Sequence, residues 1–396
     1  MLSNRENNLS SILILYTLTT LFLGKSVLQK VGIDLGNEGI IANIHYISFP
    51  ILFYAYFKKY GLYYFKKSEK FYLIFSFSYL FFIIVILDRS ANISYILNNV
   101  IEPILLVSIL RKTNEKTFES IRNIIIVFFI FECCVAIFEG ISQKILFAKV
   151  EDFDSSMINF DMRAYSLHGH PLQNAFIVSI ISTLILSYTR ISFVFRYSLF
   201  LLGYAAIFSF NTRSSILFLG LILIINVFRD IFYANIKKSQ KIGLILFLII
   251  FIPIVANFII NNNLGSRLSR QMNSDDDSSM ARFILVTILS ELSINELLLG
   301  SERAQFFQQK YRLIAIENSI VNTIFYYGII YAGYFYYIIF KKLREIKVPN
   351  FQFILIIALA FLLINTNNVL STTCPILPVT ILTMYSLYTP NKIIRL

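Results

Sequence analysis

The chain has 396 residues, of which 57% are hydrophobic and 15% are charged, and its mean hydropathy is +0.68. A soluble domain carries about 25% charged residues, so these values exclude a water-soluble globular protein. In a soluble protein the net charge of +12 would suggest a nucleic-acid partner, but here most Lys and Arg residues lie in short segments between apolar runs. Anionic lipid headgroups explain this arrangement better, so we expect membrane lipids and no nucleic acid as partners.

The apolar runs predict one all-α integral membrane domain over residues 1–396. A transmembrane helix needs about 20 apolar residues, and about twelve segments approach that length. The predicted spans are residues 10–24, 39–57, 71–87, 95–110, 121–140, 173–189, 194–210, 213–228, 242–261, 319–340, 351–366 and 370–388. The first is expected to be retained, because no small-residue cleavage site follows it.

The distribution of Lys and Arg predicts the orientation of these spans. Positive charge gathers in cytoplasmic loops, and the loops on the same side as the two termini are the denser in Lys and Arg. Both termini are therefore expected in the cytoplasm. Two long loops, 141–172 and 262–318, then lie outside, and loops of this length are usually functional or disordered. Within the second, the apolar spacing over 281–299 predicts an amphipathic helix on the membrane or over a cavity.

Three arginines, Arg163, Arg213 and Arg282, fall in segments that the charge rule places outside. Arginine suits the binding of phosphate, because its planar guanidinium stays charged and offers bidentate donors. We therefore expect the three arginines to bind a diphosphate. The alternatives are that Arg213 snorkels to the outer headgroups and that Arg282 contacts headgroups from the amphipathic helix.

Segment 163–174 holds two of the three histidines of the chain, His168 and His170. Pro171 suits the first turn of a helix, and the free N–H groups and dipole at a helix N-terminus favour an anion. We expect His168 and Asn174 to contact substrate; the alternative is a polar loop end with incidental histidines. No metal site is expected, because this His-x-His pair lacks a Cys or carboxylate partner at metal-binding spacing.

Several carboxylates are further candidates for chemistry. Glu317 and Asn318 precede the predicted helix 319–340, where Asn318 is a plausible cap and Glu317 is electrostatically favoured. The functional alternative makes Glu317 a general base near a sugar hydroxyl. Glu102 and Glu132 lie inside predicted spans, where ionisable groups are costly. They are expected either to line a sugar-accessible cavity, with Glu132 contacting substrate, or to pair with another helix.

Four motifs follow one another along residues 160–340. They are Arg163 through His170-Pro171, then Thr212-Arg213-Ser214, then Arg282 with Leu299-Gly300, and finally Glu317-Asn318 followed after nine residues by Gly328. Together, in this order and spacing, they resemble the O-antigen ligase and Wzy-type polysaccharide polymerase superfamily. Glu317 stands where ligases of that superfamily have histidine, which favours a polymerase, and Tyr331 replaces a second glycine. The first four predicted helices match no motif of the superfamily.

The resemblance implies a GT-C-like glycosyltransferase in the bacterial inner membrane, with its site on the external face under the large loop. Its donor would be an oligosaccharide on undecaprenyl diphosphate. A polymerase would add this to another lipid-linked repeat unit, giving O-antigen or capsular polysaccharide, whereas a ligase would transfer it to lipid A core. No metal, cofactor or nucleotide sugar is implied, and a chain-length regulator is a conceivable partner.

The resemblance also implies roles for individual residues. It makes Glu317, His170 and Arg213 catalytic and Arg163, Arg213 and Arg282 diphosphate-binding, whereas His168, Asn174, Asn318 and Glu132 are expected to bind substrate from their positions in the sequence. A flippase for lipid-linked oligosaccharides is the main alternative of another class. Such a transporter should show repeats between its halves, and the sequence contains none that we can detect.

Overall fold

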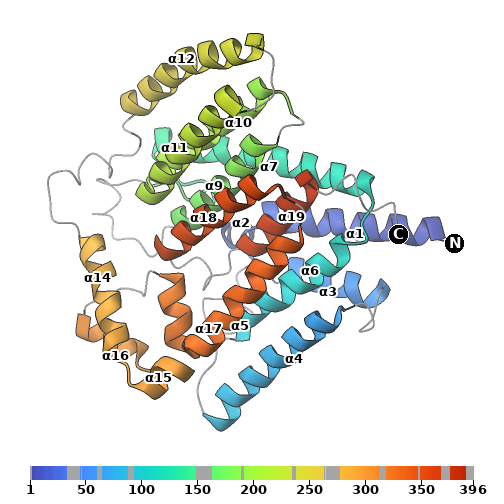
Figure 1. Ribbon diagram of the computed structural model, residues 1–396, viewed down its shortest axis with the longest axis vertical. Helices are drawn as coiled ribbons and strands as arrows, with labels where there is room; N and C mark the ends of the chain where they lie inside the picture. The colour runs from blue at the N-terminus through green and yellow to red at the C-terminus, as the bar shows by residue number, and fades with distance from the viewer. Residues whose placement is uncertain are drawn as a thin grey trace.

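The computed structural model describes eleven ranges and two single residues of the chain. They are residues 2–33, 45, 47–59, 65–87, 93–148, 163–188, 191–233, 238–262, 264, 277–311, 318–346, 348–366 and 375–388. Every regular element in these ranges is a helix (Figure 1). This agrees with the all-α prediction.

The helices follow one another as α-helices (α) with three short π-helical segments (η). They are α1 (Leu2–Phe22), α2 (Lys25–Lys30), α3 (Ser48–Lys59), α4 (Lys67–Phe81), η3 (Phe82–Ile86), α5 (Ile93–Ile96), η4 (Leu97–Ile101), α6 (Glu102–Leu110), α7 (Glu115–Ser142), α9 (Pro171–Ser187), α10 (Phe193–Phe210), α11 (Arg213–Phe228), η5 (Arg229–Tyr233), α12 (Lys238–Asn261), α14 (Asp277–Ser290), α15 (Ile294–Leu299), α16 (Ala304–Tyr311), α17 (Ser319–Glu345), α18 (Asn350–Thr366) and α19 (Ile376–Tyr388).

Six apolar helices in the described ranges are long enough to cross a membrane. They are Lys67–Ile86, Glu115–Ser142, Phe193–Phe210, Arg213–Phe232, Lys241–Asn261 and Ser319–Glu345. Shorter apolar helices are Leu9–Phe22, Ser48–Phe57, Leu97–Leu110, Pro171–Ser187, Asn350–Phe361 and Ile376–Tyr388. Each span expected from the sequence overlaps one of these helices, which indicates a helical membrane protein.

Two short helices, α9 and α19, form the centre of the bundle. Nearly every side chain of α9 is buried, and α19 is buried from Ile376 to Leu387. The two helices pack against each other, and α9 also packs against α10, α11 and α18. A helix that is apolar on all sides is stable where other helices or lipid surround it, which explains the central position of these two.

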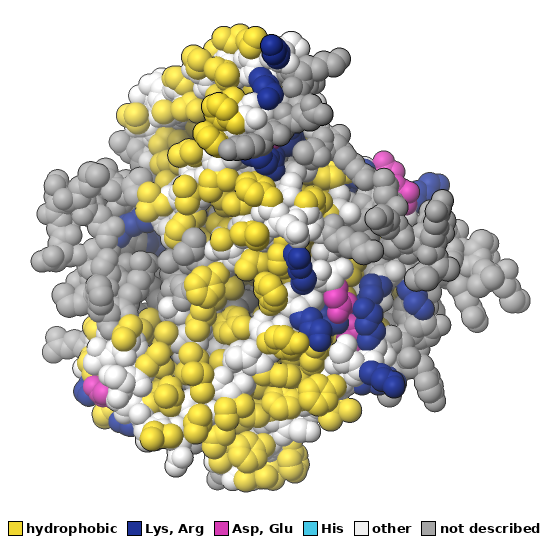
Figure 2. All heavy atoms as spheres, viewed as in Figure 1, with side chains coloured by type: hydrophobic (Ala, Val, Ile, Leu, Met, Phe, Trp, Pro, Cys, Tyr) yellow, Lys and Arg dark blue, Asp and Glu magenta, His cyan; other side chains and the backbone are white. Residues whose placement is uncertain are grey.

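Helix α12 is apolar on all sides as well, but it lies at the edge of the bundle, at the top of Figure 1. Only 17% of its most apolar window is buried, and Ile249 and Ile260 are exposed by 62% and 70%. Figure 2 shows hydrophobic side chains spread over much of the described surface in this view. Apolar surface this extensive is not tolerated by a soluble monomer, so a lipid environment accounts for it.

The segment before α17 departs from its expected form. The sequence predicts one amphipathic helix over 281–299, whereas the structure has α14 and α15 with a turn between them. Ser293 causes the break, because its hydroxyl accepts the Glu296 N–H at 3.3 Å while the Glu296 carboxylate accepts the Ser293 N–H at 2.9 Å. This capping box starts a new helix. Leu285 and Ile288 of α14 are buried with α17 residues rather than spread over a membrane surface.

The bundle has two ends, which we name by their residues. The site end comprises the C-termini of α7 and α10 and the N-termini of α9, α11 and α17. The basic end comprises the opposite ends of the same helices. At the basic end the fully buried Glu69 of α4 pairs with Arg111 and, at 2.7 Å, with Lys342 of α17. Ionic contacts thus join α4, the end of α6 and α17 there.

Candidate functional site

A turn over residues 163–170 connects to α9 and is held by a buried carboxylate of α7. Glu139 accepts N–H groups from Leu146 at 2.7 Å, Tyr165 at 2.7 Å and Ser166 at 2.8 Å. Its side chain is fully buried. Hydrogen bonds to an ionised acceptor are short and strong, so Glu139 fixes the backbone of the turn. The sequence interpretation did not single out Glu139.

Glu132 lies about two helical turns before Glu139 in α7 and faces the same segment, residues 163–170. Its Oε2 accepts the Leu167 N–H at 3.4 Å, while its Oε1 is buried with no hydrogen-bond partner in the described part of the chain. Glu102, the second carboxylate that the sequence singled out within a predicted span, accepts the hydroxyl of Tyr16 at 2.8 Å and so links α6 to α1. The helix-pairing alternative therefore describes Glu102, whereas Glu132 faces the backbone of the candidate site.

His168 is a buried histidine within the turn over residues 163–170. Its ring is 7% exposed and packs edge-on to Phe128 with the ring centroids 6.1 Å apart. Burial, and then the nearby His45, lower the pKa of His168 to about 3, so its ring is neutral at physiological pH. The N-terminal chain closes over it: a Cβ on Gly24 would lie 2.4 Å from the Leu167 carbonyl oxygen.

His170, by contrast, is exposed and caps α9. Its Nδ1 accepts the Leu172 N–H at 3.3 Å, and Pro171 occupies the first turn of the helix as predicted. One turn into α9, the fully buried Asn174 donates its amide N–H to the Tyr165 carbonyl, while its Oδ1 accepts no hydrogen bond within the described ranges. Asn174 therefore ties the turn to α9, and the two histidines have different surroundings.

A backbone hydrogen bond joins the segment that contains Arg163 to the segment that leads to Arg213. The N–H of Ala164, next to Arg163, donates to the carbonyl of Ser209 at 3.0 Å. Asn211 then ends α10 in the left-handed conformation (φ 53°), and Arg213 is the first residue of α11. Both arginine side chains are partly exposed. Segments that lie about fifty residues apart in sequence thus place two arginines at the site end.

A second contact joins the last two sequence motifs. Gly300 (φ 91°) follows α15, and Gly328 (φ 78°, ψ 163°) interrupts α17 with a kink. The Ser301 N–H donates to the Phe325 carbonyl at 2.7 Å. A Cβ on Gly328 would lie 2.1 Å from the Leu298 carbonyl oxygen, so only glycine allows α15 to approach the kink this closely.

The remaining predicted residues lie around this second contact. Asn318 caps α17, as expected, because its Oδ1 accepts the N–H groups of Ile320 at 2.9 Å and Val321 at 3.0 Å. Arg282 lies in α14, but its side chain falls outside the described part of the chain. Glu317 also lies outside the described residues.

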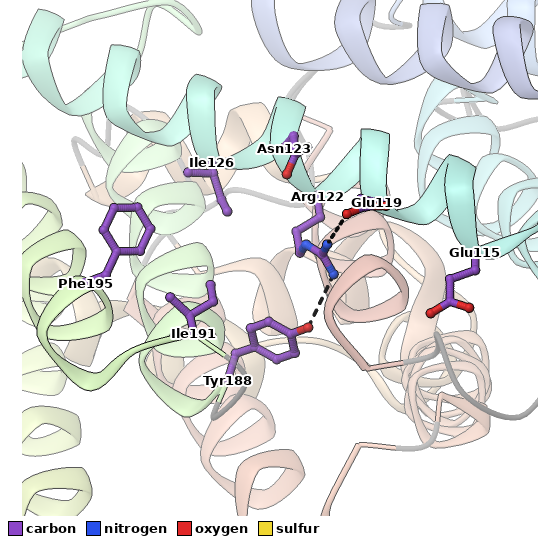
Figure 3. Close-up of a pocket in the computed structure, with 8 residues that line it drawn as sticks. All are labelled: Glu115, Glu119, Arg122, Asn123, Ile126, Tyr188, Ile191 and Phe195. Atoms are coloured by element: carbon purple, nitrogen blue, oxygen red, sulfur yellow. Dashed lines mark hydrogen bonds and ion pairs between the residues drawn. The ribbon is translucent and has the colours of Figure 1, made fainter.

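A cavity of about 500 Å³ opens at the basic end, far along α7 from Glu139 (Figure 3). Its lining includes Glu115, Glu119, Arg122, Asn123, Ile126, Tyr188, Ile191 and Phe195. In Figure 3 Arg122 points between Glu119 and Tyr188, to which it binds at 3.5 Å and 3.3 Å. No predicted site residue is among this lining.

Within the ranges that the structure describes, no three His, Cys, Asp or Glu side chains gather in a way that could hold a metal ion. Comparison of the chain with protein-family models, with curated proteins and with solved structures gives no match. The function of the site must therefore be argued from its own residues.

Proposed function

We propose that the protein is a membrane-embedded glycosyltransferase that polymerises oligosaccharide repeat units carried on undecaprenyl diphosphate. The observation that carries the proposal is the contact between Ala164 and Ser209. It brings the segments of Arg163 and Arg213 together beside the N-terminus of α9, whose helix dipole adds to the attraction for an anion. The guanidinium groups of Arg163 and Arg213, together with the N-terminus of α9, suit the binding of a lipid-linked diphosphate.

In this proposal the arginines act on the leaving group. Arg163 and Arg213, with Arg282 from α14, bind the donor diphosphate and stabilise the charge that builds on it. The bond from the anomeric carbon to the diphosphate oxygen breaks, and the acceptor hydroxyl oxygen forms the new glycosidic bond. The lipid diphosphate leaves with the electron pair. A preorganised donor in a shielded site contributes about 3 kcal/mol to such a step.

The proton of the acceptor hydroxyl goes to a general base. Of the two bases expected from the sequence, we retain Glu317, because Nδ1 of His170 already accepts a backbone N–H. That bond places the ring proton of His170 on Nε2, which makes His170 a hydrogen-bond donor to the substrate. Attack from the face opposite the diphosphate would invert the anomeric centre.

The same proposal places the chain in its membrane. All twelve apolar segments would cross the bacterial inner membrane in a GT-C-like arrangement, with both termini in the cytoplasm and the site end outside. The short spans α9 and α19 support this, because other helices surround them and they need no full-length contact with lipid. Helices α14–α16 would cover the site, and a chain-length regulator would be an external partner.

The test is polymerisation of purified lipid-linked repeat units in vitro by the Arg213→Ala and Arg213→Lys proteins. We expect Ala to lower the rate about 100-fold, and Lys to restore only part of it, because lysine lacks the bidentate fork. Arg344→Gln is the matched control, since Arg344 lies at the basic end and donates to Asn350. Full activity of both Arg213 variants would refute the assignment.

A further inference from the structure

The basic end contains a second arginine pair, which is unrelated to the proposed catalysis. Arg196 of α10 and Arg229 of η5 share one carboxylate, Asp230. Arg229 donates twice to Asp230 Oδ1, at 2.9 Å and 2.6 Å, whereas Arg196 lies 3.6 Å from Oδ2. The hydroxyl of Tyr197 donates to Oδ2 at 3.1 Å. The negative charge of Asp230 is therefore shared between the positive charges of Arg196 and Arg229.

The pair is buried, and its hydrogen bonds are incomplete. The side chains of Arg196, Arg229 and Asp230 are exposed by only 7%, 16% and 5%. Arg196 Nη1 donates to the Leu186 carbonyl at 2.7 Å, but its Nε and Arg229 Nη1 are buried with no hydrogen-bond partner among the residues that the structure describes. An unsatisfied donor on a buried charged group is costly, so the arrangement calls for an anion.

An exposed apolar stripe leads along α11 to this pair. Leu217, Leu221, Ile224, Phe228 and Phe232 recur at helical spacing and are 51–66% exposed. The stripe starts near Arg213 and ends beside Arg229. These two residues are about 24 Å apart along the helix axis, given a rise of about 1.5 Å per residue. The guanidinium of Arg229 also stacks on Phe351 of the neighbouring α18, 5.5 Å from its ring centroid. A free phosphate ion would not require this stripe, whereas the acyl chain of a lipid would cover it.

We propose that Arg196 and Arg229 form a binding site for the phosphate of an anionic phospholipid at the basic end of the bundle. The phosphate oxygens accept hydrogen bonds from Nε of Arg196 and Nη1 of Arg229. One acyl chain of the lipid lies along the apolar stripe of α11. Guanidinium suits this role because it holds phosphate oxygens with charge-assisted bonds. The site does not depend on the proposed polymerase activity.

The chain has no tryptophan, so a single introduced tryptophan reports on lipid contact. Phe228→Trp protein in vesicles would be quenched by brominated phosphatidylglycerol or, in a parallel series, by brominated phosphatidylcholine. We expect the anionic lipid to be preferred about fivefold, as for one added cationic contact. Adding Arg229→Gln should remove the preference. Adding Arg344→Gln should not, although Arg344 also stacks on an α18 ring, that of Phe353.

Asp230→Asn separates lipid binding from a purely structural role. Removing the shared carboxylate leaves more positive charge, so the preference for the anionic lipid should rise, opposite to the effect of Arg229→Gln. Equal quenching by both lipids in the Phe228→Trp protein would overturn the proposal, as would an unchanged preference in Arg229→Gln. Equal quenching by both lipids, together with saturable binding of inorganic phosphate that Arg229→Gln removes, would show a free-ion site and overturn the lipid assignment.

Discussion

Glu69 and Glu139 are both fully buried, one at each end of the bundle, and they are neutralised differently. Glu69 pairs with side-chain cations from two other helices. Glu139 accepts three backbone N–H groups, two of them from the 163–170 turn. The difference indicates that charge at the basic end joins helices, whereas charge at the site end positions a segment of backbone next to Arg163.

The largest effect on stability is expected for Glu69→Ala. This change leaves Lys342, whose side chain is 3% exposed, without its buried partner. Removing one member of a buried ion pair costs about 3–5 kcal/mol, so thermal unfolding in detergent should shift strongly downward. Lys66→Ala is the control, because Lys66 pairs with Glu345 at the surface, and it should change stability little. Equal shifts for the two variants would contradict the helix-joining role.

Gly328→Ala tests the contact between α15 and the kink of α17. The added Cβ would collide with the Leu298 carbonyl and would need a left-handed backbone, so we expect a loss of about 3 kcal/mol. Gly333 in the same helix has open space around its Cβ position. Gly333→Ala should therefore stabilise the protein slightly, by about 0.5–1 kcal/mol. Chemical denaturation in detergent compares the two, and losses of similar size would refute the close approach.

Glu139→Gln addresses the site end directly. The amide keeps one acceptor oxygen but loses the charge, so at least one N–H of the turn loses its bond, at about 2 kcal/mol. Hydrogen exchange at residues 164–167 should accelerate, and polymerisation should fall because the turn moves. For hydrogen exchange, Glu132→Gln is the matched control two turns earlier, where one oxygen already lacks a hydrogen-bond partner among the described residues. Unchanged exchange in Glu139→Gln would break the contrast between the ends.

His168 gives the site end a pH dependence of stability. Because its folded pKa of about 3 lies below the unfolded value of about 6.5, the unfolded chain takes up the proton first as pH falls. Its contribution is present above pH 6.5 and is lost toward pH 3, by about 1 kcal/mol between pH 6 and pH 5. His168→Asn should flatten this part of the stability profile. An identical profile for both proteins would show that the histidine is not buried.

The sequence predicted the elements whose signal is local. Each predicted span overlaps an apolar helix, Pro171 and His170 begin α9, and Asn318 caps α17. These positions depend on hydrophobic composition and on capping, which neighbouring residues determine. The single helix predicted over 281–299 was wrong because the Ser293–Glu296 capping box overrides the apolar spacing.

The sequence did not predict the residues whose partners are distant. Glu139 binds N–H groups 26 and 27 residues away, and backbone N–H groups leave no compositional trace. The close approach of Gly24 to Leu167 and the ion pair between Arg196 and Asp230 likewise depend on how the helices pack. For Arg163 and Arg213, the sequence predicted a common face, whereas the hydrogen bond between Ala164 and Ser209 that joins their segments appears only in the fold.

The central claim is that Arg163 and Arg213 act together on one diphosphate. A double-mutant cycle with Arg163→Gln and Arg213→Gln, read as the rate of polymerisation of lipid-linked repeat units, tests it most directly. If both arginines hold the same leaving group, the loss in the double variant should fall short of the sum of the single losses by about 1 kcal/mol or more. Strictly additive losses, or an active double variant, would contradict the account.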